Sequence, residues 1–250
     1  MITLSISLNE IRRIWLQPLV WVVLGITFVV IALLFLVLLN NFYSETQVKY
    51  AGLQFAPGVT DAVIYPMLFW STLIGALMIP IFTLRVITEE KIRQQHILLS
   101  SAPVSCRIII FSKMIALISV VLAFSLLTLI LPATIENFVD LDWGKIVSGI
   151  IGMILFQISY AAACVWIATL TKNLMFTLLS CLGLFVFSFV LFFSGSSEGS
   201  SSSLFLYLST FSHVLAPLSG LISSQDIVYF ILITLLFSAL AVIQLRYKRD

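Results

Sequence analysis

The chain has 250 residues, of which 61% are hydrophobic and only 10% are charged, and its formal net charge is +2. Soluble domains average roughly 45–50% apolar and 25% charged residues, so this composition excludes an ordinary soluble enzyme and a nucleic-acid-binding protein. The charges are clustered, and the runs between clusters are long enough for a helix to cross a hydrocarbon core of roughly 30 Å. The chain is therefore predicted to be an all-α integral membrane protein.

The first predicted element is an amphipathic helix that lies on the membrane surface. Leu4, Leu8, Ile11 and Trp15 recur at helical spacing and form one apolar stripe, while Arg12 lies on the other face. A long apolar run follows, and no small-residue cleavage site stands close behind it. We therefore expect a membrane span there rather than a signal peptide.

Six transmembrane helices are predicted within one transmembrane domain, residues 1–250. A seventh charge-free run, 199–225, is rich in serine, and its densest apolar part is too short to cross a membrane. It is predicted to be a loop followed by a short re-entrant or interfacial segment before the sixth span. The predicted spans cover about residues 18–40, 62–85, 108–135, 146–171, 174–193 and 226–245.

The distribution of basic residues predicts the orientation, because short cytoplasmic loops carry an excess of Lys and Arg. With six spans, eleven of the 13 Lys and Arg residues lie on one side, and only Lys49 and Lys145 lie on the other. A seventh span would move Arg246, Lys248 and Arg249 across the membrane. We therefore predict six helices with both termini cytoplasmic.

The sequence offers few candidates for catalysis or metal binding. The three cysteines form no C-x-x-C pair, and His96 and His213 are predicted on opposite sides of the membrane. Neither a disulfide nor a metal site is therefore expected. The sequence has no phosphate-binding loop of the form G-x-x-x-x-G-K-[ST], so we do not expect this chain to bind ATP by that route.

One stretch imitates a hydrolase motif. Gly195, Ser197 and Gly199 spell G-x-S-x-G, with His213 and Asp226 further along the chain. The motif requires a sharp turn from a strand into a helix, but here it lies in a run of seven serines among ten residues, 194–203. We expect a flexible extracytoplasmic loop rather than a hydrolase.

The centres of the predicted spans carry no charged side chain, which weighs against an ion-coupled carrier. Gln157 is the most conspicuous polar residue in a span, and we expect it to form a hydrogen bond with a neighbouring helix. Ser148 and Gly152 form a small-xxx-small pair, for which we expect close helix packing within the chain or across a dimer.

The segment 85–107 is the longest predicted cytoplasmic connection. Arg85, Glu89 and Arg93 are four residues apart, and each such pair supports a helix by roughly 0.2–0.5 kcal/mol. Pro103 ends the helical pattern, because the residue before a proline is pushed out of the α region. The pattern leaves two alternatives, a helix that projects from the second span or a solvated, charge-balanced loop.

This segment resembles the signature region of ABC-2 type transporter permeases, R-x-x-x-x-E-[KR]-x-x-G-T-x-x-x-L-L-x-x-P-[IV]-S followed by an apolar run and a lysine. Gln95 and His96 stand in place of the usual Gly-Thr pair. Two later stretches, 169–173 and 213–230, look most like the gliding-motility-associated branch of that family. The matching residues of the signature are Arg85, Glu90, Lys91, Leu98 or Leu99, Pro103, Val104, Ser105 and Lys113.

The resemblance implies the membrane-spanning permease subunit of an ATP-binding-cassette transporter, expected to be an exporter in a bacterial inner membrane. It implies a second permease chain, identical or different, and two separate ATPase subunits that hold ATP and magnesium. This chain itself would be no enzyme and would bind no cofactor, no metal and no nucleic acid, only the lipid bilayer and its partner chains. The alternative interpretation is a membrane scaffold, or a motility or assembly component, that transports nothing.

In that family, the cytoplasmic loop after the second span acts as a coupling helix that meets the ATPase together with the N-terminal interfacial helix. The residues assigned by analogy to the coupling interface are Arg85, Glu89, Glu90, Lys91, Arg93, His96, Leu98, Leu99 and Pro103, and those assigned to the interfacial helix are Leu4, Leu8, Ile11 and Trp15.

Overall fold

The structure is a computed structural model that describes residues 2–46, 49, 58–88, 105–171, 173–196, 205 and 207–247. Within these residues it contains eight α-helices and no strand. Six helical segments are long and apolar enough to cross a membrane, which confirms the predicted fold class and the number of spans. The chain is thus built as a multi-pass membrane protein.

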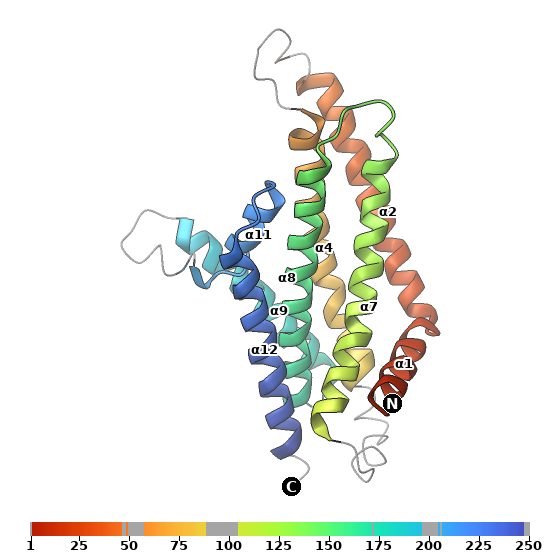
Figure 1. Ribbon diagram of the computed structural model, residues 1–250, viewed down its shortest axis with the longest axis vertical. Coiled ribbons are helices and arrows are strands. Elements are labelled where there is room, and N and C mark those ends of the chain that lie inside the picture. Colours follow the sequence, from red (N-terminus) through yellow and green to blue (C-terminus); the bar gives the residue numbers. More distant parts are fainter. Residues whose placement is uncertain are drawn as a thin grey trace.

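The six spans run alongside one another as an elongated bundle (Figure 1). They are α2 (Pro18–Asn41), α4 (Tyr65–Thr83), α7 (Cys106–Ala133), α8 (Trp143–Leu170), α9 (Leu174–Ser196) and α12 (Ser224–Tyr247). Two shorter helices are α1 (Ile2–Trp15), before the first span, and α11 (Ser212–Leu218), the predicted non-spanning segment before the sixth. Three π-helical turns extend the spans: η1 (Phe42–Thr46) after α2, and η2 (Thr60–Ile64) and η3 (Leu84–Thr88) on either side of α4.

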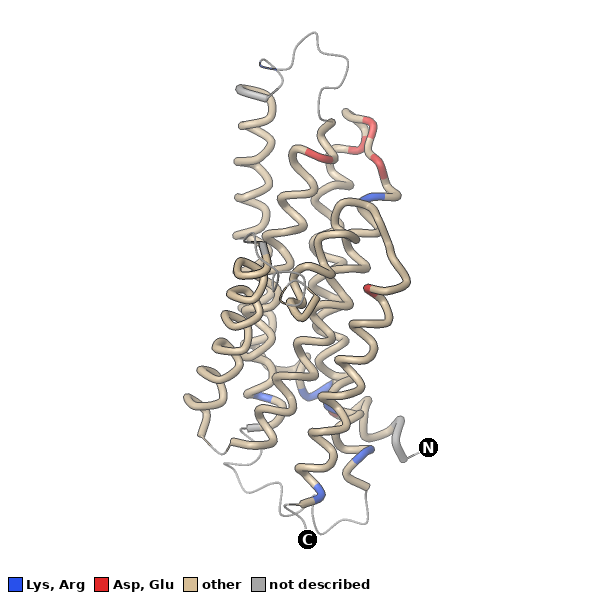
Figure 2. Tube along the Cα trace, turned by 90° about the vertical axis from the view of Figure 1, so that its left-hand side faces the viewer, with Lys and Arg blue, Asp and Glu red and all other residues tan. Residues whose placement is uncertain are grey.

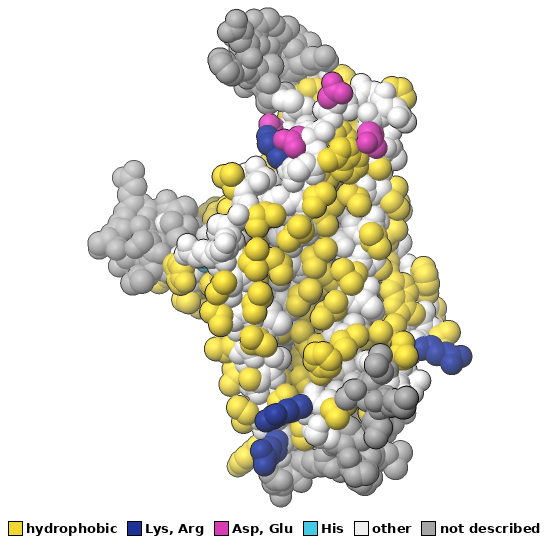
Figure 3. Space-filling view, viewed as in Figure 1, with side chains coloured by type: hydrophobic (Ala, Val, Ile, Leu, Met, Phe, Trp, Pro, Cys, Tyr) yellow, Lys and Arg dark blue, Asp and Glu magenta, His cyan; other side chains and the backbone are white. Residues whose placement is uncertain are grey.

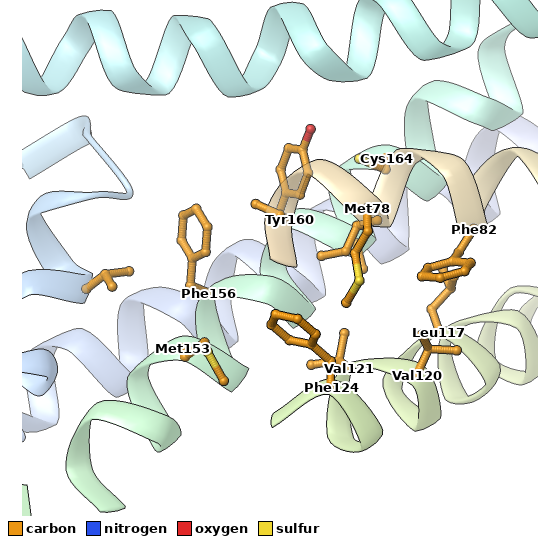
Figure 4. Close-up of a cluster of buried hydrophobic side chains, with 14 of the residues drawn as sticks. Met78, Phe82, Leu117, Val120, Val121, Phe124, Met153, Phe156, Tyr160 and Cys164 are labelled. Atoms are coloured by element: carbon orange, nitrogen blue, oxygen red, sulfur yellow. The ribbon is translucent and has the colours of Figure 1, made fainter. Parts of the chain in front are cut away.

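α4 and α8 form the centre of the bundle. Their most apolar windows are 61% and 67% buried, whereas those of α2, α9 and α12 are 17% buried or less. α7 packs against the same centre, where Phe82 of α4, Phe124 of α7 and Phe156 of α8 all point into one cluster (Figure 4). The three peripheral helices therefore present their apolar side chains to the surroundings, as expected of helices that face lipid.

The surface has the banded character of a membrane protein. Apolar side chains cover the middle of the face shown in Figure 3, and charged side chains occur only toward its two ends. A monomeric soluble protein rarely exposes a contiguous apolar patch of this extent. The arrangement agrees with six spans embedded in a bilayer.

Most of the described charges lie toward the two ends of the bundle, where basic residues predominate at one end and acidic residues at the other (Figure 2). α1 and the end of α12 both lie at one of them (Figure 1), so the two ends of the described chain are on the same side. We call this the basic end, and its described charged residues are Glu10, Arg12, Arg13, Arg85, Arg107, Lys113 and Arg246. The opposite, acidic end carries Asp61, Glu136, Asp140, Asp142 and Lys145.

At the acidic end, polar contacts fix the start of α8 against the turn that precedes α4. Lys145 Nζ donates to Asp61 Oδ1 at 2.8 Å, and the Asp142 backbone N–H donates to Thr60 Oγ1 at 3.2 Å. The Asp142 carboxylate also caps α8, since its Oδ1 accepts from the Lys145 backbone N–H at 3.3 Å. A capping acceptor satisfies one of the free N–H groups at the helix start and sets where α8 begins.

α11 lies directly on α8. Ser148 Oγ donates to the Pro217 carbonyl at 2.8 Å, and a Cβ added to Gly152 would lie only 2.5 Å from Pro217 Cβ. The small-xxx-small pair predicted from the sequence therefore serves close packing within the chain. Because α11 has only seven residues, it is too short to cross the membrane. Its position therefore depends on these contacts with α8.

Candidate functional site

The candidate site lies at the basic end, where α1 packs against α7. Ser7 and Ile14 of α1 are buried, and Trp15 Nε1 donates to Ser119 Oγ of α7 at 3.1 Å. The predicted apolar stripe is divided between two surroundings, because Ile11 and Trp15 pack on the core while Leu8 is 59% exposed. α1 is thus a helix that is attached to the bundle by one face and leaves Leu8 free to contact a membrane surface.

A pair of tryptophans sets the bend between α1 and the first span. Trp21 Nε1 donates to the Trp15 carbonyl at 3.0 Å, and the two indole rings meet edge to face with centroids 5.3 Å apart. Pro18 stands at the start of α2, where its missing N–H costs nothing and its fixed φ suits a helix. The bend therefore depends on three residues within one short stretch, and it directs α1 onto α7.

Lys113 of α7 joins three elements at this end. Its side chain is nearly buried, and its Nζ donates to the Val86 carbonyl of η3 at 2.7 Å. The same Nζ lies 3.6 Å from Glu10 Oε1 of α1, whose side chain is 12% exposed. A buried ammonium is costly unless it is paired and hydrogen-bonded, so the carboxylate and the carbonyl together make this position tenable for lysine.

The Lys113 junction, defined as Lys113, Glu10 and the Val86 carbonyl, lies at the point where the chain leaves the second span. η3 continues α4, and Val86 lies within its five residues, Leu84–Thr88. Lys113 therefore fixes the last turn of the second span relative to both α1 and α7.

The structure places only part of the predicted coupling interface. Arg85 lies in η3, in the same turn as Val86, at the basic end. Glu89, Glu90, Lys91, Arg93, His96, Leu98, Leu99 and Pro103 lie outside the described residues. Of the predicted interfacial residues, Leu8, Ile11 and Trp15 are placed on α1 as described above, and Leu4 lies on the same helix.

The surroundings of Gln157, at the centre of the bundle, do not match the role predicted for it. Its side chain is fully buried on α8, but neither its Nε2 nor its Oε1 has a hydrogen-bond partner among the described residues. The expected interhelical hydrogen bond is therefore wrong. The amide occupies the space left by Gly75 of α4, since a Cβ there would overlap Gln157 Nε2 and would lie 2.7 Å from Phe124 Cε1.

Sequence reasoning missed the partners of Lys113, although the residue itself was matched to the permease signature. No local pattern connects Glu10 to Lys113, because the two lie on helices that are far apart in the sequence. The available signal was the presence of a lysine eight residues after Ser105, within an otherwise apolar segment. A charge so close to a span predicts a partner, but it does not identify that partner.

No family model matches the chain, and a search of curated proteins also found no match.

Proposed function

We propose that this chain is the membrane-spanning permease subunit of an ATP-binding-cassette transporter, acting as an exporter in a bacterial inner membrane. The Lys113 junction carries the proposal. It links α1 and the end of the second span, and these are the two elements expected to meet an ATPase. The loop that begins at this junction has the sequence that resembles the coupling region of ABC-2 type permeases.

The charge separation supports the corresponding orientation. Lys and Arg residues concentrate in short cytoplasmic loops, so the basic end is assigned to the cytoplasm together with both termini. The acidic end then faces the opposite side. In this orientation the segment 89–104 is available to a cytoplasmic partner.

The mechanism uses the rigidity of the second span. The sequence has no phosphate-binding loop, so ATP and magnesium are assigned to two partner ATPase subunits. Closure of those subunits would push on the loop after η3, and α4 would carry the displacement into the centre of the bundle, where it packs on α8. Moving a two-state equilibrium from 1:99 to 99:1 requires roughly 5.5 kcal/mol of differential binding, which a docked pair of ATPases could provide.

A second permease chain completes the proposed complex. ABC transporters work with two transmembrane halves, and the sparsely buried α2, α9 and α12 leave apolar surface for lipid and for such a partner. Whether the second chain is a copy of this one or a different permease is decided by the composition of the purified complex.

The test is purification of the tagged chain from its native membranes in mild detergent, followed by identification of the co-purifying chains and measurement of ATP hydrolysis. We expect an ATPase in the complex, and we expect Glu90→Ala combined with Leu98→Ala to abolish its association. The matched control, Asp140→Ala with Leu221→Ala, changes one acidic residue and one leucine that are exposed near the opposite side. It should leave association intact.

Two results would contradict the proposal. One is a complex without any ATP-hydrolysing chain, which favours the alternative of a non-transporting scaffold. The other is undiminished ATPase association and hydrolysis in the Glu90 and Leu98 double variant, which removes this loop from the mechanism.

A further inference from the structure

The second span carries a proline in its interior. Pro80 lies within α4 and has no backbone N–H, so it cannot donate to the Ala76 carbonyl four residues earlier. Its ring also presses against that carbonyl, and sharp helix kinks are commonly found at such prolines. Ala76 is fully buried, so bulk solvent supplies no replacement donor. In a membrane, a carbonyl freed by proline is satisfied by neighbouring side chains or helices.

The hydroxyl groups along α4 do not supply that donor. Each of the hydroxyls of Ser71, Thr72 and Thr83 donates instead to the carbonyl four residues before its own. The side chains on either side of Pro80 are apolar, and Met78 and Phe82 both lie in the buried hydrophobic cluster (Figure 4). A donor for the Ala76 carbonyl therefore has to come from another helix.

Gln157 of α8 is an unused donor beside this carbonyl. Its side chain is fully buried, and neither of its amide atoms has a hydrogen-bond partner among the described residues. The amide lies against Gly75, the residue next to Ala76, since a Cβ on Gly75 would overlap Gln157 Nε2. An unpaired donor thus lies one residue away from an acceptor that has lost its helical partner. A hydrogen bond between them would remove the cost of burying both groups.

The two ends of the second span are held by different neighbours. At the acidic end, Asp61 of η2 pairs with Lys145 of α8. At the basic end, the Val86 carbonyl of η3 accepts from Lys113 of α7. Pro80 lies between these two attachments. The half of α4 that leads into η3 can therefore change its direction while the other half remains on α8.

We propose that α4 is hinged between Ala76 and Pro80 and that Gln157 controls the hinge. In the conformation described above, the Gln157 amide has no partner. In a second conformation, a larger bend at Pro80 turns the Ala76 carbonyl out of the helix toward α8, and Gln157 Nε2 donates to it. The hinge lies wholly within this chain, so it goes beyond the proposed function and does not depend on an ATPase.

The test measures how each half of α4 lies relative to α8, in the chain reconstituted into lipid bilayers without any ATPase. Spin labels on Leu84→Cys and Leu170→Cys report on the half that leads into η3. Labels on Trp70→Cys and Val147→Cys report on the other half, and both of these positions are exposed. The background is Cys106→Ser, since the other two native cysteines are buried. Distances are measured by pulsed electron paramagnetic resonance.

The expected displacement is large enough to resolve. Leu84 lies about two turns beyond Ala76, or about 12 Å along a helix, so a bend of about 20° moves it by about 4 Å. We expect two distances between Leu84 and Leu170 that differ by about this amount. The pair formed by Trp70 and Val147 should show a single distance.

Three substitutions should change the share of the bent conformation. Lys113→Met releases η3 and should increase it. Gln157→Met should remove it, because methionine cannot donate to the Ala76 carbonyl. Pro80→Ala should also leave a single distance, since the new backbone N–H takes up that carbonyl. The matched control, Gln225→Met at an exposed position of α12, should keep both distances.

Four results would overturn the proposal. They are a single distance between Leu84 and Leu170 in the parent chain, a second distance that persists in Gln157→Met, a smaller share of the bent conformation in Lys113→Met, and a change between Trp70 and Val147 that accompanies the change at Leu84. If Gln157→Met does not fold, Pro80→Ala decides the question, because two distances in that variant would show that the proline is not the hinge.

Discussion

Replacing Lys113 with methionine tests the junction at the basic end most directly. Methionine keeps the length and apolar character of the lysine stem but removes the ammonium. The Val86 carbonyl then loses a charged hydrogen bond, worth about 1.5–3 kcal/mol. Glu10 is also left as a largely buried carboxylate without this cation, and breaking a buried pair in this way costs about 3–5 kcal/mol in total.

The expected effect on stability is large enough to measure in detergent. For a chain of this size, about 1 kcal/mol corresponds to a change in Tm of roughly 2–4 °C, so Lys113→Met should lower Tm by roughly 6–20 °C. Heating in the presence of a thiol-reactive dye gives the readout, because Cys164 and Cys181 are buried until the bundle opens. Arg246→Met is the matched control, and as an exposed substitution it should change the stability by no more than about 0.5 kcal/mol.

A double-mutant cycle separates the ion pair from general loss of packing. Glu10→Gln removes the charge but leaves an oxygen that can accept from Lys113. The loss of unfolding free energy in the combined variant should be smaller than the sum of the two single losses by about 0.5–3 kcal/mol, because no unpaired buried carboxylate remains. The reasoning is refuted if the two effects simply add, or if Lys113→Met and Arg246→Met shift Tm equally.

Two further substitutions test the packing of α8. Gln157→Met should raise the free energy of unfolding by about 1–3 kcal/mol, because it removes a buried amide that has no described hydrogen-bond partner. Gln225→Met, at an exposed position, serves as its control. A lower Tm for Gln157→Met would show that the amide does form hydrogen bonds. Gly152→Ala should cost about 1–3 kcal/mol, since the new Cβ would meet the Pro217 ring at 2.5 Å. Gly183→Ala on α9, where a Cβ meets nothing within 4 Å, should instead be neutral or stabilising by up to about 1 kcal/mol. Equal Tm shifts in the two glycine variants would contradict the close packing of α11 on α8.

The sequence predicts the spans well because each span has a simple physical requirement. A charge-free run of sufficient length is enough, so the predicted spans 18–40 and 226–245 differ from α2 and α12 by no more than two residues at either end. The short α11 was predicted for the same reason, since its segment lacks the length to cross. The opposed charges of the two ends follow from the loops alone.

Contacts between helices were not predictable in the same way. Gln157 was expected to find a polar partner, but its neighbours are Gly75 and Phe124, which offer no side-chain donor or acceptor. The hydrogen bond between His213 and Asp226 spans a turn and a change of helix, so no periodicity indicates it. Such contacts depend on how the helices rotate against one another, which hydrophobicity alone does not determine in lipid.

The packing of α11 on α8 has a consequence for the order in which the protein folds during synthesis. A seven-residue helix is about 10 Å long, roughly a third of the hydrocarbon thickness, so the insertion machinery cannot release it into the bilayer as a span of its own. It can reach its place only by folding back onto a surface that is already in the membrane. α8, with Ser148 and Gly152, provides that surface and is synthesised earlier. α12 carries Asp226 and follows α11 in the chain, so the contact between His213 and Asp226 forms only after the start of α12 has been synthesised.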